Sequence, residues 1–306
     1  VEESMDGSIR AFAPATVSNI ACGFDVMGFA VDGPGDEVVA ERRDEPGIEI
    51  LEVTGDDGRL PMDAERNTAG VAVRALLDVC GRRDGVALWV HKRMPLSSGL
   101  GSSAASAVAA AKAVAELLGL DVDRDTLLRC ALEGERVACG SAHPDNATPC
   151  VYGGFVLIRS GDPLDVIELP VPESLTCALV RPHVEVETRA ARTALGDTVP
   201  LSAAVEQWGN LGALVAGLFR GDLELISRSL HDSIAEPKRA HLVPGFPEAQ
   251  AAAMNADALG CSLSGSGPSI FALCDGVERA EVVATAMADA VADLGLGVDR
   301  LVSKVG

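Results

Sequence analysis

The chain has 306 residues, of which 48% are hydrophobic and only 3% aromatic, and its net charge is −20. This length predicts two domains rather than one, with cores built from small aliphatic side chains. The acidic excess excludes nucleic acid and anionic membranes as partners, and no run approaches the roughly 18–20 apolar residues that a membrane helix needs.

Short β-like runs alternate with longer helical patterns, which indicates a mixed α and β protein. In chain order we expect strands at residues 36–42 and 48–54, a helix at 68–79, a strand at 85–92, helices at 103–118 and 124–139, a strand at 153–158, and helices at 203–220 and 278–294. Prolines concentrate within residues 160–174, where helical periodicity is absent. We therefore predict domains at residues 1–165 and 166–306.

The most informative segment lies between the predicted strand 85–92 and an alanine-rich helix. It reads P-L-S-S-G-L-G-S-S-A-A, which is Pro95, Leu96, Ser97, Ser98, Gly99, Leu100, Gly101, Ser102, Ser103, Ala104 and Ala105. The glycines let successive N–H groups point at one anion, the serines add hydroxyl donors, and the positive end of the helix favours a phosphate. The alternative is a flexible turn before a helix. The Walker A pattern is absent, because no lysine lies in this loop.

Three segments together resemble the galactokinase, homoserine kinase, mevalonate kinase and phosphomevalonate kinase (GHMP) superfamily. The loop at 95–105 is similar to its phosphate loop, A-P-A-T-V-S-N-I-A-C-G-F-D at 13–25 to its first motif, and C-S-L-S-G-S-G-P-S-I-F-A-L at 261–273 to its third. The resemblance implies an α+β fold of two domains: an N-terminal domain similar to ribosomal protein S5 domain 2, which binds ATP, and a ferredoxin-like C-terminal domain. The active site is expected between them.

Within the superfamily, N-x-x-x-G-F-D in the first motif resembles the branch that phosphorylates the hydroxyl of homoserine in threonine biosynthesis. The segments G-S-A-H-P-D-N at 140–146 and A-E-P-K-R-A-H-L-V-P-G-F at 235–246 agree with that branch. The first motif departs from it at Ala21 and Cys22, where glycine and proline are more usual. The resemblance implies ATP and Mg²⁺ as cofactors and homoserine as the substrate.

Mg²⁺ prefers oxygen ligands beside phosphates, and Ser103 with Glu135 would supply a hydroxyl and a carboxylate. The family spacing of eleven residues before Asn146 selects Glu135 over Glu133. Either glutamate could instead lie on a solvated helix face. Asn67 resembles a nucleotide-contacting asparagine, although a plain helix cap would look the same.

Homoserine is a zwitterion, so its pocket needs cations for the carboxylate and acceptors for the ammonium group. Arginine grips a carboxylate with two hydrogen bonds, and Arg192 and Arg239 match the family's carboxylate-binding positions. Arg189 competes with Arg192 for this role, and a surface arginine is the alternative for both. By resemblance, the rest of the amino acid is contacted by Asn19, Asp25, His143 and Asn146.

On chemical grounds Asp25 is a candidate general base. Mevalonate kinases, however, carry an aspartate as the presumed base where Asn146 stands here, and an amide cannot accept a proton at neutral pH. If Asn146 occupies that position, catalysis would depend on alignment and charge neutralisation, and Asp25 would bind the ammonium group. Gly265 and Gly267 of the third motif are expected to close over the phosphates and substrate, with a plain tight turn as the alternative.

The acidic excess and the presence of only four lysines suggest adaptation to molar salt, with an acidic mesophile as the alternative. A chain that is fully folded in low salt and gains no stability from KCl would refute the salt hypothesis. The first ten residues lack the pattern of a secretory signal, so we expect a cytoplasmic protein. The sequence leaves a homodimer open.

Two other functions compete with this prediction. The first is another kinase of the superfamily, which acts on mevalonate, shikimate or a sugar-like alcohol and shares the loop. Those substrates lack an ammonium group, so Arg192, Arg239 and the pair of Asn19 and Asp25 argue against them. A non-catalytic nucleotide-binding regulator would share the fold without turnover. The intact loop and the metal candidates argue against the regulator.

Overall fold

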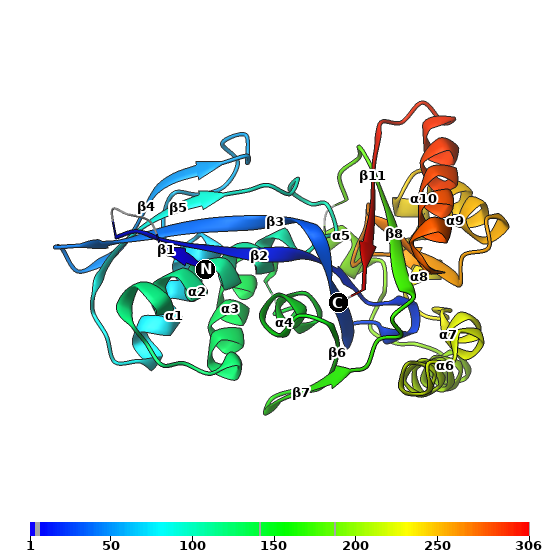
Figure 1. Cartoon of the computed structure of the whole chain (residues 1–306), viewed down its shortest axis with the longest axis horizontal. Coiled ribbons are helices and arrows are strands. Elements are labelled where there is room, and N and C mark those ends of the chain that lie inside the picture. The colour runs from blue at the N-terminus through cyan, green and yellow to red at the C-terminus, as the bar shows by residue number, and fades with distance from the viewer. Residues whose placement is uncertain (4–6, 141, 187, 306) are drawn as a thin grey trace.

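The computed structural model describes residues 1–3, 7–140, 142–186 and 188–305. It has two parts, each built on one β-sheet with helices packed against it (Figure 1). None of the described helices is long and apolar enough to cross a membrane.

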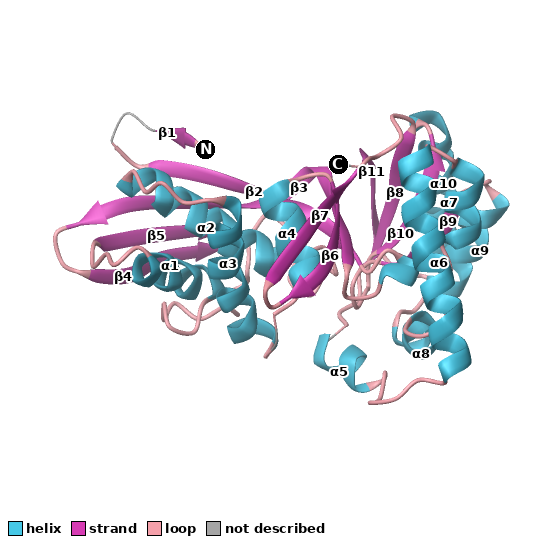
Figure 2. Cartoon of the chain, turned by 90° about the horizontal axis from the view of Figure 1, so that it is seen from below, coloured by secondary structure: helices cyan, strands magenta, loops and turns pink. Residues whose placement is uncertain are grey.

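The N-terminal part is a mixed sheet covered on one face by four helices (Figures 1 and 2). Its strands run in the order β1, β2, β3, β5, β4, with β6 and β7 attached to one end of β3. The strands are β1 (Glu2–Glu3), β2 (Ile9–Ser18), β3 (Met27–Arg43), β4 (Gly47–Thr54), β5 (Gly85–His91), β6 (Phe155–Gly161) and β7 (Leu164–Leu169); the helices are α1 (Thr68–Val79), α2 (Ser102–Leu118), α3 (Arg124–Cys139) and α4 (Pro144–Tyr152). β4 and β5 are parallel, with α1 as the crossover between them.

The C-terminal part is an antiparallel sheet with strands in the order β11, β8, β10, β9. Its elements are β8 (Leu175–Pro182), α5 (Thr188–Thr193), α6 (Leu201–Arg220), α7 (Leu223–Ser229), α8 (Glu236–Arg239), η2 (Ala240–Leu242), α9 (Phe246–Asn255), β9 (Gly260–Leu263), β10 (Ile270–Asp275), α10 (Val277–Ala292) and β11 (Val298–Lys304). The fourth strand of this part lies beside the first, and the first beside the third, which is the ferredoxin-like order. The expected α+β fold with these two domain types is confirmed.

Local sequence explains why the predicted helices form where they do. Asn67 accepts a hydrogen bond from the Ala69 N–H at the start of α1, and Asp123 does the same for Thr126 in α3. α2 ends at Gly119 in the left-handed conformation that a helix terminus favours. Most residues of α2 are buried, and its alanines let it pack closely against β2 and β3.

The proline-containing segment 160–174 is not simply a linker. It includes the turn of a hairpin and the strand β7, which pairs with β6 in the first sheet. The second sheet begins at Leu175 in β8. The predicted boundary at 165/166 therefore falls inside β7, and the division of the chain at that point stays a prediction.

An aromatic cluster joins the two parts. The ring of Phe29 in β3 lies 5.4 Å from that of Phe155 in β6 and 6.3 Å, edge to face, from that of Phe271 in β10. All three side chains are fully buried. A backbone bridge between Val31 and Val305 adds a second connection. These contacts fix the third motif, which ends within β10, against the N-terminal part.

Candidate active site

The three sequence motifs meet at the N-terminus of α2. From the third motif, the hydroxyl of Ser264 donates to the Gly99 carbonyl at 2.6 Å, and that of Ser269 donates to the Ser98 carbonyl at 2.7 Å. The loop is thus held by hydrogen bonds from the opposite domain.

The loop also requires glycine at two positions. Gly99 and Gly101 have φ angles of +76° and +70°, which L side chains rarely adopt. A Cβ atom on Gly99 would lie 2.7 Å from the Ser264 carbonyl oxygen, and one on Gly101 would lie 2.2 Å from the Thr16 hydroxyl. Thr16 also donates its backbone N–H to the Leu100 carbonyl at 3.0 Å. Within the described residues no side chain caps α2, so its first-turn N–H groups are available to an anion.

A buried ion pair beneath this helix was not predicted from the sequence. The ammonium of Lys92 contacts the carboxylate of Asp36, with 2% and 0% of the two side chains exposed. Lys92 also donates to the Ser102 carbonyl at 2.7 Å, and the hydroxyls of Ser102 and Ser106 donate to Asp36 at 2.8 Å. Burial lowers the pKa of Lys92, and Asp36 opposes that effect. The network fixes the start of α2 relative to β3 and β5.

Glu135 and Ser103 lie side by side, as a metal site needs. Glu135 is 2% exposed, and its Oε1 accepts no hydrogen bond from the described residues. Burial raises the pKa of Glu135 to about 7, while a hydrogen bond from Ser103 and the charge of Lys92 act in the opposite direction. A buried carboxylate oxygen without a partner, next to a hydroxyl, fits Mg²⁺. Glu133 is instead half exposed and pairs with Arg136 at 3.7 Å.

The charged candidates for the amino acid pair with one another. Arg192 in α5 donates two hydrogen bonds to Asp25, at 2.6 and 3.0 Å, and its Nη2 lies 3.2 Å from Nδ1 of His143. Burial, with help from Arg192, lowers the pKa of His143. The side chain of Arg189 lies outside what the structure describes. A carboxylate and a guanidinium therefore face each other at the position expected for a zwitterion.

Arg239 belongs to the same cluster although it lies in α8. It is 4% exposed and donates to the carbonyls of Ala191, at 3.0 Å, and Gly265, at 3.3 Å. Its guanidinium lies 5.0 Å from the ring centre of Phe24, and that of Arg192 lies 5.4 Å from the same ring. Two cations thus contact one aromatic ring, which compensates part of their repulsion.

Amide side chains connect this cluster to the phosphate loop. Asn19 has a left-handed backbone, donates to the Gly265 carbonyl at 2.8 Å and accepts the Asp25 N–H at 3.1 Å. Asn146 accepts a hydrogen bond from Thr16 at 3.0 Å, and its Oδ1 would lie 2.8 Å from a Cβ atom on Gly101. Asn146 therefore lies between the charged cluster and the start of α2. In the third motif, the Gly267 N–H donates to the Ser264 carbonyl at 2.9 Å within the turn.

Asp145 is a site residue that sequence reasoning missed. Its carboxylate lies within 4.8 Å of ligand atoms of Asp25 and His143, its side chain is buried, and its Oδ1 has no hydrogen-bond partner among the described residues. Burial, and then the charge of Asp25, raise the pKa of Asp145 to about 7. The H-P-D-N pattern contains it, but nothing in the sequence shows that it faces Asp25.

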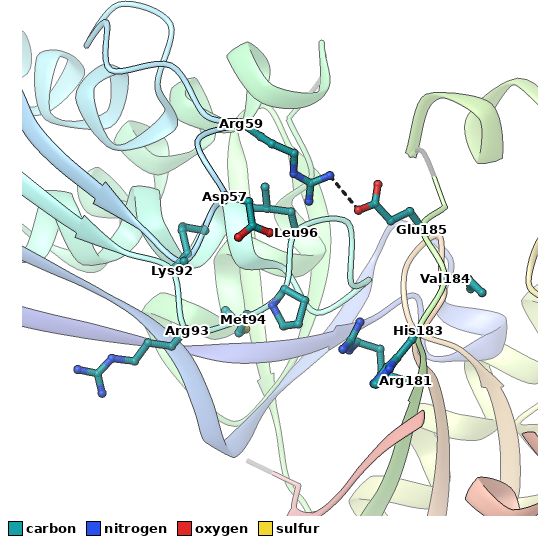
Figure 3. Close-up of a pocket in the computed structure, with 12 residues that line it drawn as sticks. Asp57, Arg59, Lys92, Arg93, Met94, Leu96, Arg181, His183, Val184 and Glu185 are labelled. Atoms are coloured by element: carbon teal, nitrogen blue, oxygen red, sulfur yellow. Dashed lines mark hydrogen bonds and ion pairs between the residues drawn. The ribbon is translucent and has the colours of Figure 1, made fainter. Parts of the chain in front are cut away.

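A separate cavity of about 450 Å³ opens where the phosphate loop begins (Figure 3). Pro95 and Leu96 line it, and Figure 3 shows Arg59 of the N-terminal part reaching Glu185 of the C-terminal part, at 2.8 Å. Asn67 does not line this cavity. Its amide caps α1 and donates to the Pro61 carbonyl, so it is engaged in a structural role.

Comparisons with known proteins agree with this fold. The model of the GHMP kinases N terminal domain matches residues 67–154, and that of the GHMP kinases C terminal matches residues 214–293. The chain therefore belongs to the GHMP kinases. Mevalonate kinase from L. major and galactokinase from Lactococcus lactis, both at 16% identity with TM-scores of 0.72, share the fold.

Relatives of higher identity include several homoserine kinases. That of Chlorobium phaeobacteroides is 51% identical over 92% of each chain, and that of Xanthomonas campestris is 43% identical over 95% of this chain and 88% of the relative. The crystal structure of homoserine kinase from Cytophaga hutchinsonii covers 100% of this chain and 97% of its own, at 53% identity with a TM-score of 0.96.

Proposed function

We propose that the protein transfers the terminal phosphate of ATP to the hydroxyl of homoserine. The observation that carries this proposal is the pair of Asp25 and Arg192, joined by two hydrogen bonds close to the uncapped start of α2. A zwitterion can replace the contacts that these two side chains make with each other. Mevalonate, shikimate and galactose carry no ammonium group and cannot do so.

The nucleotide would bind on the other side of Asn146. Its phosphates fit the backbone N–H groups at the start of α2, and the neighbouring cavity at Pro95 and Leu96 accepts the nucleoside. Ser103 and Glu135 would hold Mg²⁺, which neutralises phosphate charge when bound. Because the cytoplasm supplies ATP, the proposal places the reaction there.

Homoserine would lie with its carboxylate on Arg192 and Arg239 and its ammonium group on Asp25. Asp145 places a second carboxyl group beside Asp25, so the ammonium would meet two oxygen acceptors. Asn146 is placed to orient the hydroxyl towards the phosphates. Asp25 already pairs with Arg192, and Asn146 cannot take a proton, so this chain would act by alignment and charge rather than by a general base at Asn146.

An ADP-release assay tests the proposal. With Mg-ATP, we expect turnover with homoserine and less than about 1% of that rate with mevalonate, shikimate or galactose, because an alcohol without an ammonium group forms no charge-assisted hydrogen bond with Asp25 and is not aligned with the phosphates. If ADP is released faster with another alcohol than with homoserine, that alcohol is the preferred substrate and the proposal is wrong. ATP binding without turnover on any of them would favour a regulator.

A matched pair of variants tests the metal site. Glu135→Gln should lower kcat at least about 100-fold, because it removes a charged ligand of the metal. Glu133→Gln, two residues earlier on the same helix, should leave kcat within about twofold because Glu133 faces solvent. Equal effects of the two changes would contradict the assignment.

A further inference from the structure

The cavity at the start of the phosphate loop contains a carboxylate that has no partner. Asp57 lines the cavity, and its side chain forms no hydrogen bond or ion pair with the residues that the structure describes. Every other charged residue of the lining has a charged partner within 4 Å; these are Arg59, Lys92, Arg93, Arg181, His183 and Glu185. Asp57 is therefore the lining charge that is free to meet a ligand.

The loop that carries Asp57 is held in place from both sides. The preceding Asp56 is 4% exposed, and its carboxylate accepts the N–H of Leu60 at 2.9 Å. Gly55 has a φ angle of +76°, and a Cβ atom there would lie 2.0 Å from the carbonyl oxygen of Lys92. The loop is thus pressed against the end of β5, from which the phosphate loop departs.

The backbone of Asp57 is in a conformation that side chains generally avoid. Its φ angle is +53°, in the left-handed region that favours glycine. Figure 3 shows its carboxylate turned inwards among the lining residues, whereas Arg93 points away from them. Strain that is kept at a position where it directs a side chain into a cavity indicates a role in binding.

The chemistry of this carboxylate narrows the choice of ligand group. It can only accept hydrogen bonds, so it needs an O–H or N–H donor. A metal ion is not favoured, because the one cluster of three metal-binding side chains among the described residues is Asp25, His143 and Asp145. A triphosphate would be repelled by the negative charge. The donor is therefore a neutral hydroxyl or amino group.

We propose that Asp57 accepts hydrogen bonds from the 2′ and 3′ hydroxyls of the ribose of ATP. This inference rests on the proposed function, which places the nucleoside in this cavity. The ribose is the part of the nucleoside that is bonded to the phosphates, and Pro95 and Leu96 of the phosphate loop line the same cavity as Asp57. Two adjacent hydroxyls match the two oxygens of one carboxylate.

Steady-state kinetics with homoserine and two nucleotides test this proposal. For the unmodified protein, the KM for 2′,3′-dideoxyATP should be about 10-fold higher than the KM for ATP, because the hydrogen bonds to the carboxylate are lost. Asp57→Gly should raise the KM for ATP about 10-fold and bring the two KM values within about twofold of each other. Glycine suits the φ angle at this position, so the loop should keep its shape.

A second carboxylate provides the matched control. Asp44 lies in the exposed turn between β3 and β4, outside the cavity lining, and Asp44→Gly removes the same charge. Both KM values of this variant should stay within about twofold of those of the unmodified protein. An unmodified protein that does not distinguish the two nucleotides, or a 10-fold preference that survives in Asp57→Gly, would overturn the proposal.

Two further measurements separate the alternatives. If Asp57→Gly weakens the preference for ATP over GTP and leaves that over 2′,3′-dideoxyATP intact, the carboxylate contacts the base and the ribose proposal is wrong. Calorimetric binding of ATP and 2′,3′-dideoxyATP, without an alcohol acceptor, should give the same 10-fold ratio. That ratio is measured whether or not homoserine is phosphorylated, so failure of the proposed function is distinguished from failure of this inference.

Discussion

The two halves of the candidate site are built in different ways. The phosphate half consists of backbone N–H groups and glycines, held by hydroxyl-to-carbonyl hydrogen bonds such as Ser264 to Gly99 and Ser269 to Ser98. The amino-acid half consists of charged side chains, Asp25, Arg192 and Arg239, which contact one another or a shared ring. Substitutions in the phosphate half should therefore act through steric clashes, and substitutions in the amino-acid half through loss of charge pairing.

The largest effect on kcat is expected from a substitution in the phosphate half at a position where an added side-chain atom has no room. Gly101→Ala should lower kcat at least about 100-fold, because the new Cβ atom would meet Thr16 at 2.2 Å and displace the loop by a fraction of an ångström or more. Gly119→Ala is the control, since Gly119 ends the same helix with a φ angle of +61° and nothing within 4 Å. That variant should lose about 1 kcal/mol of stability and keep its kcat.

A smaller and more selective effect is expected in the amino-acid half. Arg192→Gln should raise the KM for homoserine about 10- to 100-fold, because it removes charge-assisted hydrogen bonds. The KM for ATP should change less than about twofold. The KM of Arg192→Lys for homoserine should lie between those of the unmodified protein and Arg192→Gln, because lysine keeps the charge but not the planar fork of the guanidinium group. An equal rise in both KM values would mean that the two halves are not separable.

Titration of Asp145 gives a third test. The pKa of Asp145 is raised to about 7 in the folded chain. Just below pH 7 the folded chain therefore holds a proton on Asp145 that the unfolded chain has already lost. The stability that this proton contributes disappears as pH rises through 7. Asp145→Asn should remove this dependence: relative to the variant, the unmodified protein should lose about 1.4 kcal/mol between pH 6 and pH 8. Urea unfolding of both proteins at pH 6 and pH 8 measures this change in the free energy of unfolding.

The comparison with the variant is needed because other groups face the same region. Asp25, His143 and Arg192 surround Asp145, and Glu135 also has a pKa raised to about 7. All of them are present in both proteins, so the difference isolates Asp145. Parallel stability curves for the two proteins would show that Asp145 stays ionised throughout.

The smallest effect is expected at Ala21, where glycine is more usual in similar kinases. Its φ angle is +52°, which costs alanine about 1–2 kcal/mol. Glycine would relieve that strain, but it would lose a buried methyl group, about 0.8 kcal/mol, and about 0.4–1 kcal/mol of chain entropy. Ala21→Gly should therefore change the urea midpoint very little. A large loss of stability would mean that the methyl group has a packing role.

The phosphate half could be predicted from the sequence because it is local. One strand, the ten connecting residues 92–101 and one helix follow each other in the chain, and the expected helix at 103–118 corresponds to α2 at Ser102–Leu118. The amino-acid half is assembled from Asp25, His143, Arg192 and Arg239, which lie far apart in the sequence. Only resemblance to a family could bring these residues together in advance.

What sequence reasoning missed depends on long-range contacts. Asp36 and Lys92 pair across 56 positions, and Asp145 is distinguished from other aspartates only by its burial. The strands of the second sheet were also missed. β9 has four residues and β10 six, nearly all of them buried, so the alternation of polar and apolar residues that marks a strand is absent.

The pairing of Lys92 has a consequence for how the nucleotide is held. Its ammonium is enclosed by Asp36, Ser106 and the Ser102 carbonyl, and is therefore withdrawn from any phosphate above the loop. In the proposed site, the attraction for the triphosphate would then come from peptide dipoles, which neither titrate nor react. Reagents that acylate accessible amines should consequently leave ATP affinity intact.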